Sequence, residues 1–328
     1  MQITLSPVVS MHFFEFQSDH GRRWKMIRRV YTLIVSIAIS TLFAQSSLAA
    51  EQIPVFVSIP PQQYFVQQIG KDLVDVQVMV RPGANPATYE PSPRQMAALA
   101  KTKTYFAIGV PFENTWLPKI AAANPKIRVV HTDHGIKKAP MAAHYHHDDA
   151  GKHHTADEPD ESQQAPGGLD PHIWLAPPLV KIQARTVLAA LQEIDPAHKS
   201  VYAANCRKFT AEIDRLDAEL KQSFSGNKGL RFMVFHPSWG YFARAYGLEQ
   251  VPIEIEGKAP KPAQLKKLIE HALENGIKVV FVQPQFSARS AALVAREIGG
   301  QVAFADPLAE DWMANLRNVA NKFKLALK

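Results

Sequence analysis

The stretch 53-IPVFVSIPPQQYFVQQIGKDLVDVQVMV-80 holds two apolar strand candidates separated by one short helix candidate. We expect strands over residues 53–59 and 74–80 and a helix over about 61–69. Strand, helix and strand joined by short connections are typical of a parallel sheet. This stretch therefore predicts an α/β protein.

The same alternation continues through the chain, on both sides of a helical middle. In the first half we expect a turn at 81–86, a helix over 92–101, a strand over 104–109, a helical stretch to about 123 and a strand over 127–132. In the second half we expect strands over 230–235, 251–255, 277–283 and 301–306, and helices over 239–247, 261–276, 287–299 and 311–328. The sequence therefore predicts two Rossmann-like α/β lobes.

A helical segment over residues 177–224 connects the two halves. It is interrupted at Asp195 and Pro196, because proline ends one helix and suits the first turn of the next. The second helix, over 197–224, would contain about 28 residues and extend roughly 42 Å. The expected division is an N-terminal lobe over 50–195, a linking helix over 196–225 and a C-terminal lobe over 226–328. A ligand cleft would lie between the lobes.

The N-terminal region carries the three parts of a secretory signal peptide. Met26 precedes Arg28 and Arg29, the apolar run 30–43 follows, and 46-SSLAA-50 supplies small side chains for cleavage after Ala49. The apolar run is shorter than the ~20 residues that a membrane-spanning helix needs. No cysteine lies at the cleavage point, so we expect a signal peptide over 26–49 and a soluble periplasmic protein. Residues 1–25 show no export signal, and we interpret them as a mis-set start with Met26 as initiator.

Composition agrees with an exported protein that is stabilised by its core. The single cysteine, Cys206, has no partner for an intramolecular disulfide. Residues 1–49 hold five basic and two acidic residues of the totals of 37 and 30, which leaves 32 and 28 in the exported chain. This balance, with no basic stripe among aromatic residues, argues against nucleic-acid binding.

A histidine-rich segment, 144-HYHHDDAGKHH-154, lies in the polar stretch 135–169 that we expect to be disordered. Its imidazoles suit zinc, copper, nickel and iron, and we expect a flexible loop that collects metal. A solvated loop without a role is the alternative. The five histidines are His144, His146, His147, His153 and His154.

Three further polar residues are candidate ligands. His236 and Asp306 directly follow predicted strands, in 235-FHPSWGYFARAYGL-248 and 304-FADPLAED-311, and ligands of parallel sheets bind at the carboxyl ends of strands. His172 lies in 169-LDPHIWLAP-177. Taken singly, each is more often a capping or hydrogen-bonded structural residue than a metal ligand.

Five ordered blocks raise the expectation of a metal site: PG-x-x-P followed by YEP, then DPHIWL, FHPSWGYFARAYGLE, VFVQPQFS and ADPL, with the histidine-rich loop just ahead of DPH. In these blocks the chain resembles the zinc- and manganese-binding solute-binding proteins of bacterial ABC importers, the ZnuA/TroA-like family, over essentially the whole exported chain. The resemblance implies two α/β lobes joined by a long helix, with a metal held in the cleft and delivered to a membrane permease.

Carried over to this sequence, the resemblance implies His172, His236 and Asp306 as metal ligands. The family's remaining histidine belongs to a PHxYEP motif, which here is 86-PATYEP-91 with Ala87 in its place. Either the metal keeps three protein ligands and a water, or Glu90, Tyr89 or a loop histidine takes the open position. Glu90 is favoured chemically, because carboxylates bind zinc readily.

The ligand types favour zinc over manganese, which prefers oxygen-rich sites, while copper and nickel stay open. Two histidines and a carboxylate with an open position also describe a catalytic zinc centre. The chain contains no HExxH or GxSxG motif, however, so we expect a binding protein and not an enzyme. The expected function is capture of Zn²⁺ by a monomer and its delivery to an ABC permease in the inner membrane. The alternative is a periplasmic zinc buffer or chaperone without a permease.

Overall fold

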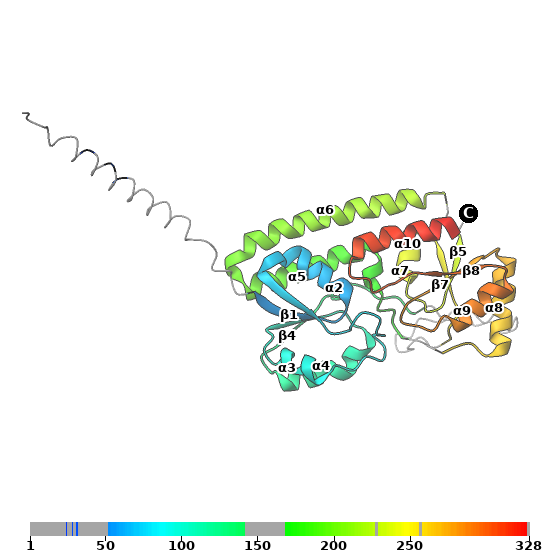
Figure 1. The fold of residues 1–328 in the computed structure, drawn as a ribbon, viewed down its shortest axis with the longest axis horizontal. Helices are drawn as coiled ribbons and strands as arrows, with labels where there is room; N and C mark the ends of the chain where they lie inside the picture. Colours follow the sequence, from blue (N-terminus) through cyan, green and yellow to red (C-terminus); the bar gives the residue numbers. More distant parts are fainter. Residues whose placement is uncertain are drawn as a thin grey trace, which may run out of the picture. The chain divides into compact units, whose positions relative to one another are not determined.

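Two parallel four-stranded sheets form the framework of the chain in the computed structural model (Figure 1). The structure describes Trp24, Arg28, Tyr31 and residues 52–141, 168–226, 229–255 and 258–326. The described residues from Gln52 onward belong to one compact unit.

The first sheet has the strand order β2-β1-β3-β4, and all of its neighbours are parallel. Its strands are β1 (Ile53–Val57), β2 (Val74–Val78), β3 (Thr104–Ala107) and β4 (Arg128–His131). The helices between them are α2 (Pro60–Gly70), α3 (Pro93–Leu99) and α4 (Pro111–Ala123), with a 3₁₀ turn, η1 (Lys71–Leu73), after α2. Each of the three helices has a proline in its first turn, where the missing N–H costs no hydrogen bond.

The second sheet repeats this arrangement with the order β6-β5-β7-β8. Its strands are β5 (Arg231–Val234), β6 (Glu249–Pro252), β7 (Val279–Val282) and β8 (Gln301–Phe304). Its helices are α7 (Gly240–Tyr246), α8 (Pro262–Glu274), α9 (Arg289–Glu297) and α10 (Trp312–Ala326). The predicted α/β class with two Rossmann-like sheets is therefore confirmed.

Two long helices follow the first sheet: α5 (Pro177–Ile194), entered through the 3₁₀ turn η2 (Ile173–Leu175), and α6 (Lys199–Ser223). The helix α6 has 25 residues and begins after a 3₁₀ turn, η3 (Pro196–His198). It starts two residues later than expected. The Asp195 carboxylate stabilises the break, because it accepts a hydrogen bond from the Tyr202 hydroxyl at 2.6 Å and contacts the His198 ring nitrogen at 2.7 Å.

Helices α6 and α10 lie side by side and pack against elements of both sheets (Figure 1). In α6, Phe209 packs against the Phe65 ring of α2 at 6.0 Å, and Phe224, its C-cap, packs against Phe242 of α7 at 5.8 Å. In α10, Trp312 meets Phe65 edge to face at 5.2 Å. Buried residues of both sheets therefore belong to one continuous apolar cluster.

Strand β6 and the polar stretch 135–169 also differ from the sequence expectation. Strand β6 spans Glu249–Pro252 and not 251–255, because its pairing with β5 aligns Glu249 with Arg231, whose side chains also form an ion pair at 2.8 Å. The ends of the stretch expected to be disordered pair with each other: Pro140 and Leu169 form an antiparallel bridge. The histidine-rich segment 144–154 lies outside the described residues.

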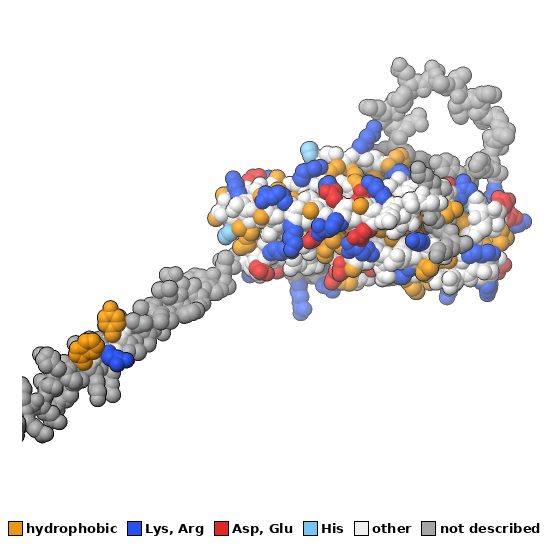
Figure 2. Space-filling view, turned by 90° about the horizontal axis from the view of Figure 1, so that it is seen from above, with side chains coloured by type: hydrophobic (Ala, Val, Ile, Leu, Met, Phe, Trp, Pro, Cys, Tyr) orange, Lys and Arg blue, Asp and Glu red, His pale blue; other side chains and the backbone are white. Residues whose placement is uncertain are grey.

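The surface of the described part carries mixed charge. On the face seen in Figure 2, Lys and Arg side chains are interspersed with Asp and Glu. Such a face lacks the single-sign stripe that polyanion binding needs. No helix among the described residues is both long enough and apolar enough to span a membrane. The division of the chain at residues 195 and 225 stays a prediction, as does the signal peptide.

We predict that Phe323→Ala costs about 3–5 kcal/mol of unfolding free energy. Phe323 is fully buried, and its ring lies 4.3 Å from those of both Phe232 and Phe281, so the change leaves a cavity where α10 meets the second sheet. Leu325→Ala on the same helix is the control, since Leu325 is 72% exposed. Urea unfolding of residues 50–328 measures both. Equal costs would contradict the role given to Phe323.

Candidate metal centre

Four polar residues follow the four strands of the second sheet at their carboxyl ends. His236 comes after β5, Glu254 after β6, Gln285 after β7 and Asp306 after β8. The strand order reverses between β5 and β7, and ligands of such sheets bind at the carboxyl ends beside this point. His236 and Gln285 follow the two strands that flank it.

A cavity of about 70 Å³ lies at these strand ends, and segments of both sheets line it. The loop after β2 contributes Asn85 and Ala87, and the segment before η2 contributes His172. His236 and Gln285 complete its polar lining. The structure thus brings together two predicted ligands and the alanine that replaces the family's histidine.

The two imidazoles lie close together in the cavity. The ring centroids of His172 and His236 are 5.2 Å apart, and the ring planes are inclined by 68°. With Zn–N bonds of about 2.1 Å and a tetrahedral angle at the metal, two imidazole centroids lie roughly 5 Å apart. The observed centroid spacing of 5.2 Å matches this value.

Each imidazole is held from behind by a buried carboxylate. His172 Nδ1 lies 2.7 Å from Asp170 Oδ1, and His236 Nδ1 lies 2.6 Å from Glu254 Oε1. A carboxylate accepts a hydrogen bond from Nδ1–H, which assigns the tautomer in which Nε2 is free to bind a metal. Carboxylate, histidine and metal in this order are typical of zinc sites. Helix α7 approaches Asp170 closely at Gly240. A Cβ atom at this position would lie only 3.2 Å from Asp170 Oδ2, so the absence of a side chain allows the approach.

Burial favours the neutral form of His172, the form that binds metal. Removal from water lowers the pKa of the His172 imidazole, and the neighbouring Asp170 carboxylate only partly offsets this. Protons compete with metal for Nε2, so a lowered pKa keeps the nitrogen available in mildly acidic solution.

The backbone of His236 is fixed by Gln283, a fully buried residue. The Gln283 amide nitrogen donates to the His236 carbonyl at 2.6 Å, and its oxygen accepts from the His236 N–H at 3.2 Å. The Phe286 ring stacks on the His236 imidazole with centroids 4.8 Å apart. These contacts restrict the imidazole before any ligand arrives.

Asp306, the third predicted ligand, lies one residue beyond the cavity lining. Its Oδ1 accepts hydrogen bonds from Gln285 Nε2 and from the Leu308 N–H, both at 2.9 Å. Within the described part of the chain, no three His, Cys, Asp or Glu side chains converge as a ready metal cluster. Asp306 therefore stays a predicted ligand that is connected to the cavity through Gln285.

The residues suggested for the coordination position left open at Ala87 are not seen in the cavity lining. Glu90 is exposed, and it is not among the residues that line the cavity. The Tyr89 hydroxyl donates to Gln95 Oε1 at 2.9 Å, and its ring packs against Phe112. The loop histidines lie outside the described residues.

The sequence contained signals for the supporting residues that we did not use. Asp170 stands two residues before His172. At this spacing its carboxylate accepts a hydrogen bond from the His172 backbone N–H at 2.9 Å and also faces the His172 ring. Glu254 follows a strand in the same way as His236, although a solvated position fitted its sequence context equally well. Gln285 lies just after β7 at the same edge of the sheet.

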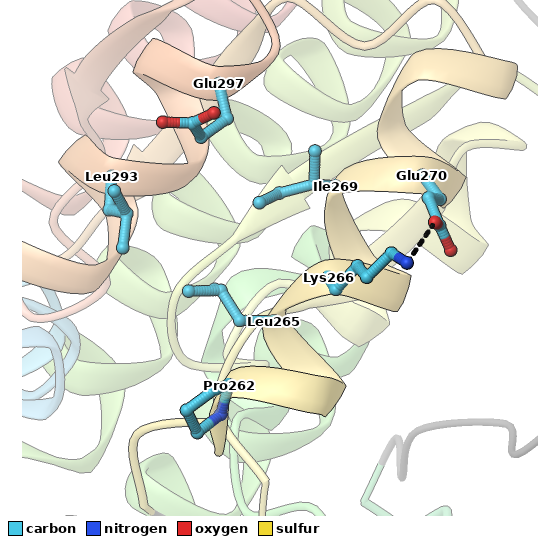
Figure 3. A pocket seen from close by; sticks show the side chains of 7 residues that line it. All are labelled: Pro262, Leu265, Lys266, Ile269, Glu270, Leu293 and Glu297. Atoms are coloured by element: carbon cyan, nitrogen blue, oxygen red, sulfur yellow. Dashed lines mark ion pairs between the residues drawn. The ribbon is translucent and has the colours of Figure 1, made fainter.

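A larger groove of about 430 Å³ lies between α8 and α9 (Figure 3). Leu265, Ile269 and Leu293 form much of its lining, with Lys266 and Glu270 paired at 3.8 Å on its rim. Its lining holds no histidine. The groove therefore does not compete with the smaller cavity as a zinc site.

Comparison with known proteins gives a consistent family match. A family model described as "Zinc-uptake complex component A periplasmic" matches residues 55–326. The "High-affinity zinc uptake system protein ZnuA" of Bacillus subtilis (strain 168) is 25% identical over 294 residues, which cover 88% of this chain and 89% of that protein.

Two solved structures show the same similarity at 43% sequence identity. The structure described as "Crystal structure of ZnuA" has a TM-score of 0.76 and covers 85% of this chain and 100% of its own. The one described as "Crystal structure of 138-173 ZnuA deletion mutant plus zinc bound" has a TM-score of 0.75 and covers 85% and 99%.

We predict that Asp170→Asn and Glu254→Gln each weaken zinc binding about 10- to 100-fold. Each change keeps the shape of the side chain but removes the charge that holds the Nδ1 proton of a ligand histidine. Competition with a chelator of known affinity measures the loss. Asp214→Asn, at the exposed ion pair with Lys181, is the matched control and should bind like the unaltered protein. Unchanged affinity in both test variants would argue against the anchoring role.

Proposed function

The chain belongs to the family of zinc-uptake complex component A proteins of the periplasm, and we propose that it captures Zn²⁺ between the His172 and His236 imidazoles. Solute-binding proteins of this family serve ABC uptake systems and are not enzymes. Membership in such a system implies a permease partner and zinc as the ligand.

The pairing of the two imidazoles carries this proposal. Both rings line one cavity, their centroids are 5.2 Å apart, and each Nδ1 faces a buried carboxylate. Burying a carboxylate is costly unless it is paired, and each of these two acids is paired with the Nδ1 atom of one of the two imidazoles.

Asp306 completes the proposed donor set. Both hydrogen bonds that described residues donate to its side chain end at Oδ1, so Oδ2 is the oxygen offered to the metal. Two imidazole nitrogens with a carboxylate oxygen favour zinc over manganese. The two carboxylates behind the rings compensate for the charge that the metal brings into a partly buried site.

The remaining steps of the proposed function are inferred from the amino-acid sequence. The signal peptide over 26–49 directs export to the periplasm, where the chain acts as a monomer. Loop histidines 144, 146, 147, 153 and 154 gather metal weakly and raise its concentration near the cavity. Docking on an inner-membrane permease then releases the zinc.

We predict that the chain without residues 144–154 binds one tight zinc, and that His236→Ala lowers this affinity by about a hundredfold or more. Loss of a direct ligand should lower the zinc affinity at least as much as loss of a supporting residue, which typically lowers it 10- to 100-fold. Competitive zinc titration against a chelator gives both values.

His271→Ala is the control for this experiment, because His271 lies on α8 outside the cavity lining. It should leave the affinity unchanged. Absence of tight zinc binding in the loop-deleted protein would refute the cavity as the capture site and favour a zinc buffer that uses the loop.

We also predict that deletion of 144–154 lowers the number of zinc ions bound per chain while the tight site keeps its affinity. The loop offers imidazoles without a fixed geometry, so its binding is weak and additional. Isothermal titration of the intact and loop-deleted chains separates the two classes of site. Loss of tight binding on deletion, equal to that in His236→Ala, would show that the loop is part of the capture site.

A further inference from the structure

Gln285 occupies an unusual position between the cavity and Asp306. It lines the cavity together with Ala87, His172 and His236. Its amide nitrogen donates to Asp306 Oδ1 at 2.9 Å. A carboxylate can only accept hydrogen bonds, so this contact fixes which end of the amide faces Asp306. The oxygen, Oε1, must therefore be at the other end.

The Gln285 amide oxygen is buried and has no hydrogen-bond partner within the described part of the chain. Gln283, two residues earlier, shows the contrast: its oxygen accepts from the His236 N–H, and its nitrogen donates to two oxygens. A buried acceptor without a partner is destabilising, and native proteins keep few of them. Such an atom in the lining of a ligand cavity points to a partner that arrives with the ligand.

The cavity also lacks one donor. Ala87 lines it at the place of the family's histidine and has no atom that can bind a metal. Glu90 is exposed and the Tyr89 hydroxyl is bonded to Gln95. Among the polar residues that line the cavity, Asn85 already accepts from the Ala87 N–H through its side-chain oxygen at 2.8 Å. Other described residues also have a buried oxygen without a partner, Glu254 among them, but Gln285 is the one of these that lines the cavity.

We propose that Gln285 Oε1 is a ligand of the bound zinc and supplies the donor missing at Ala87. This inference rests on the proposed function of the same cavity. The donor set then has two nitrogens, from His172 and His236, and two oxygens, from Asp306 and Gln285. Hydrogen bonding to Asp306 orients the Gln285 amide, so the two oxygen donors are presented as one unit.

The exchange of an imidazole for a neutral amide oxygen has a chemical consequence. Amide oxygen is a harder and weaker donor for zinc than imidazole, and oxygen donors suit manganese better. The site therefore binds zinc less tightly, and discriminates less against manganese, than the same site with histidine at position 87.

The test combines Gln285→Leu with Ala87→His in the exported chain, with zinc affinity measured by chelator competition. The histidine-rich loop is unchanged in all variants, so its contribution cancels. We expect Gln285→Leu to weaken zinc binding about tenfold or more, as a lost ligand should. Ala87→His should tighten binding, and in its presence Gln285→Leu should cost little, because the new imidazole takes the same position. An equal cost in both backgrounds would overturn the proposal.

A second cycle separates a ligand from a residue that only positions Asp306. In the Asp306→Ala background, Gln285→Leu should still weaken zinc binding if Oε1 contacts the metal. If the cost disappears with Asp306, Gln285 acts through that carboxylate and is not a ligand. Gln285→Asn retracts the oxygen by one methylene and keeps the amide, so it should also weaken binding and serves if the leucine variant folds poorly. Both substitutions should alter the visible absorption of bound Co²⁺, which reports the ligand set.

Gln63→Leu is the matched control, a half-buried glutamine outside the cavity that donates to the Val76 carbonyl. It should bind zinc like the unaltered chain. His236→Ala distinguishes the two levels of the hypothesis. If His236→Ala abolishes tight binding and neither Gln285 variant changes it, only the role of Gln285 is wrong. If His236→Ala has no effect either, the cavity itself is not the zinc site.

Discussion

One apolar cluster contains buried residues of both sheets, and it holds the segments that line the cavity close to one another. Helices α6 and α10 each pack aromatic residues against elements of both sheets, so burial of Phe209, Phe224 and Trp312 holds the two together. Two indole nitrogens reinforce the contact: Trp312 donates to the Trp174 carbonyl and Trp174 to the Pro307 carbonyl, both at 2.7 Å. Buried N–H groups need such partners, which makes this packing specific.

The carboxyl ends of the two sheets meet because of this packing. Parallel strands place their following loops at one edge, and the cavity takes lining residues from the loops of both sheets. A further bond crosses the same region: the Tyr241 hydroxyl donates to the Asp170 carbonyl at 3.0 Å. The residue that orients His172 is thereby tied to α7 of the second sheet, so the two imidazoles keep their spacing.

The electrostatics of the cavity follow from where its charges are buried. Asp170 and Glu254 are buried beside the imidazoles and are not part of the cavity lining, so they set the tautomer of each ring from behind. Burial keeps His172 neutral by lowering its pKa. In the proposed function, a divalent cation brings positive charge that these two carboxylates would balance. The same arrangement tolerates a neutral donor such as Gln285, because the anionic groups are already present.

The sequence by itself determined the α/β class and the order of the elements, because these depend on short-range patterns. Apolar strands alternate with helices at lengths that only a parallel sheet accommodates, and proline marks the helix starts. His236 follows directly after β5, so the rule for strand ends located it. Asp306 follows β8 in the same way. The resemblance to a family was needed to favour a metal role for His172, His236 and Asp306, since none of them differs locally from a structural residue.

Only the tertiary structure decided which polar atoms meet. The pairing of Glu254 with His236 joins residues that are 18 positions apart, and that of Gln285 with Asp306 joins residues 21 apart. No local pattern encodes such distances, because they depend on how the loops of neighbouring strands pack. The same holds for Glu90, whose carboxylate chemistry suits zinc although the fold leaves it exposed. Residue type sets what a side chain can bind, and packing between distant segments sets whether it can reach.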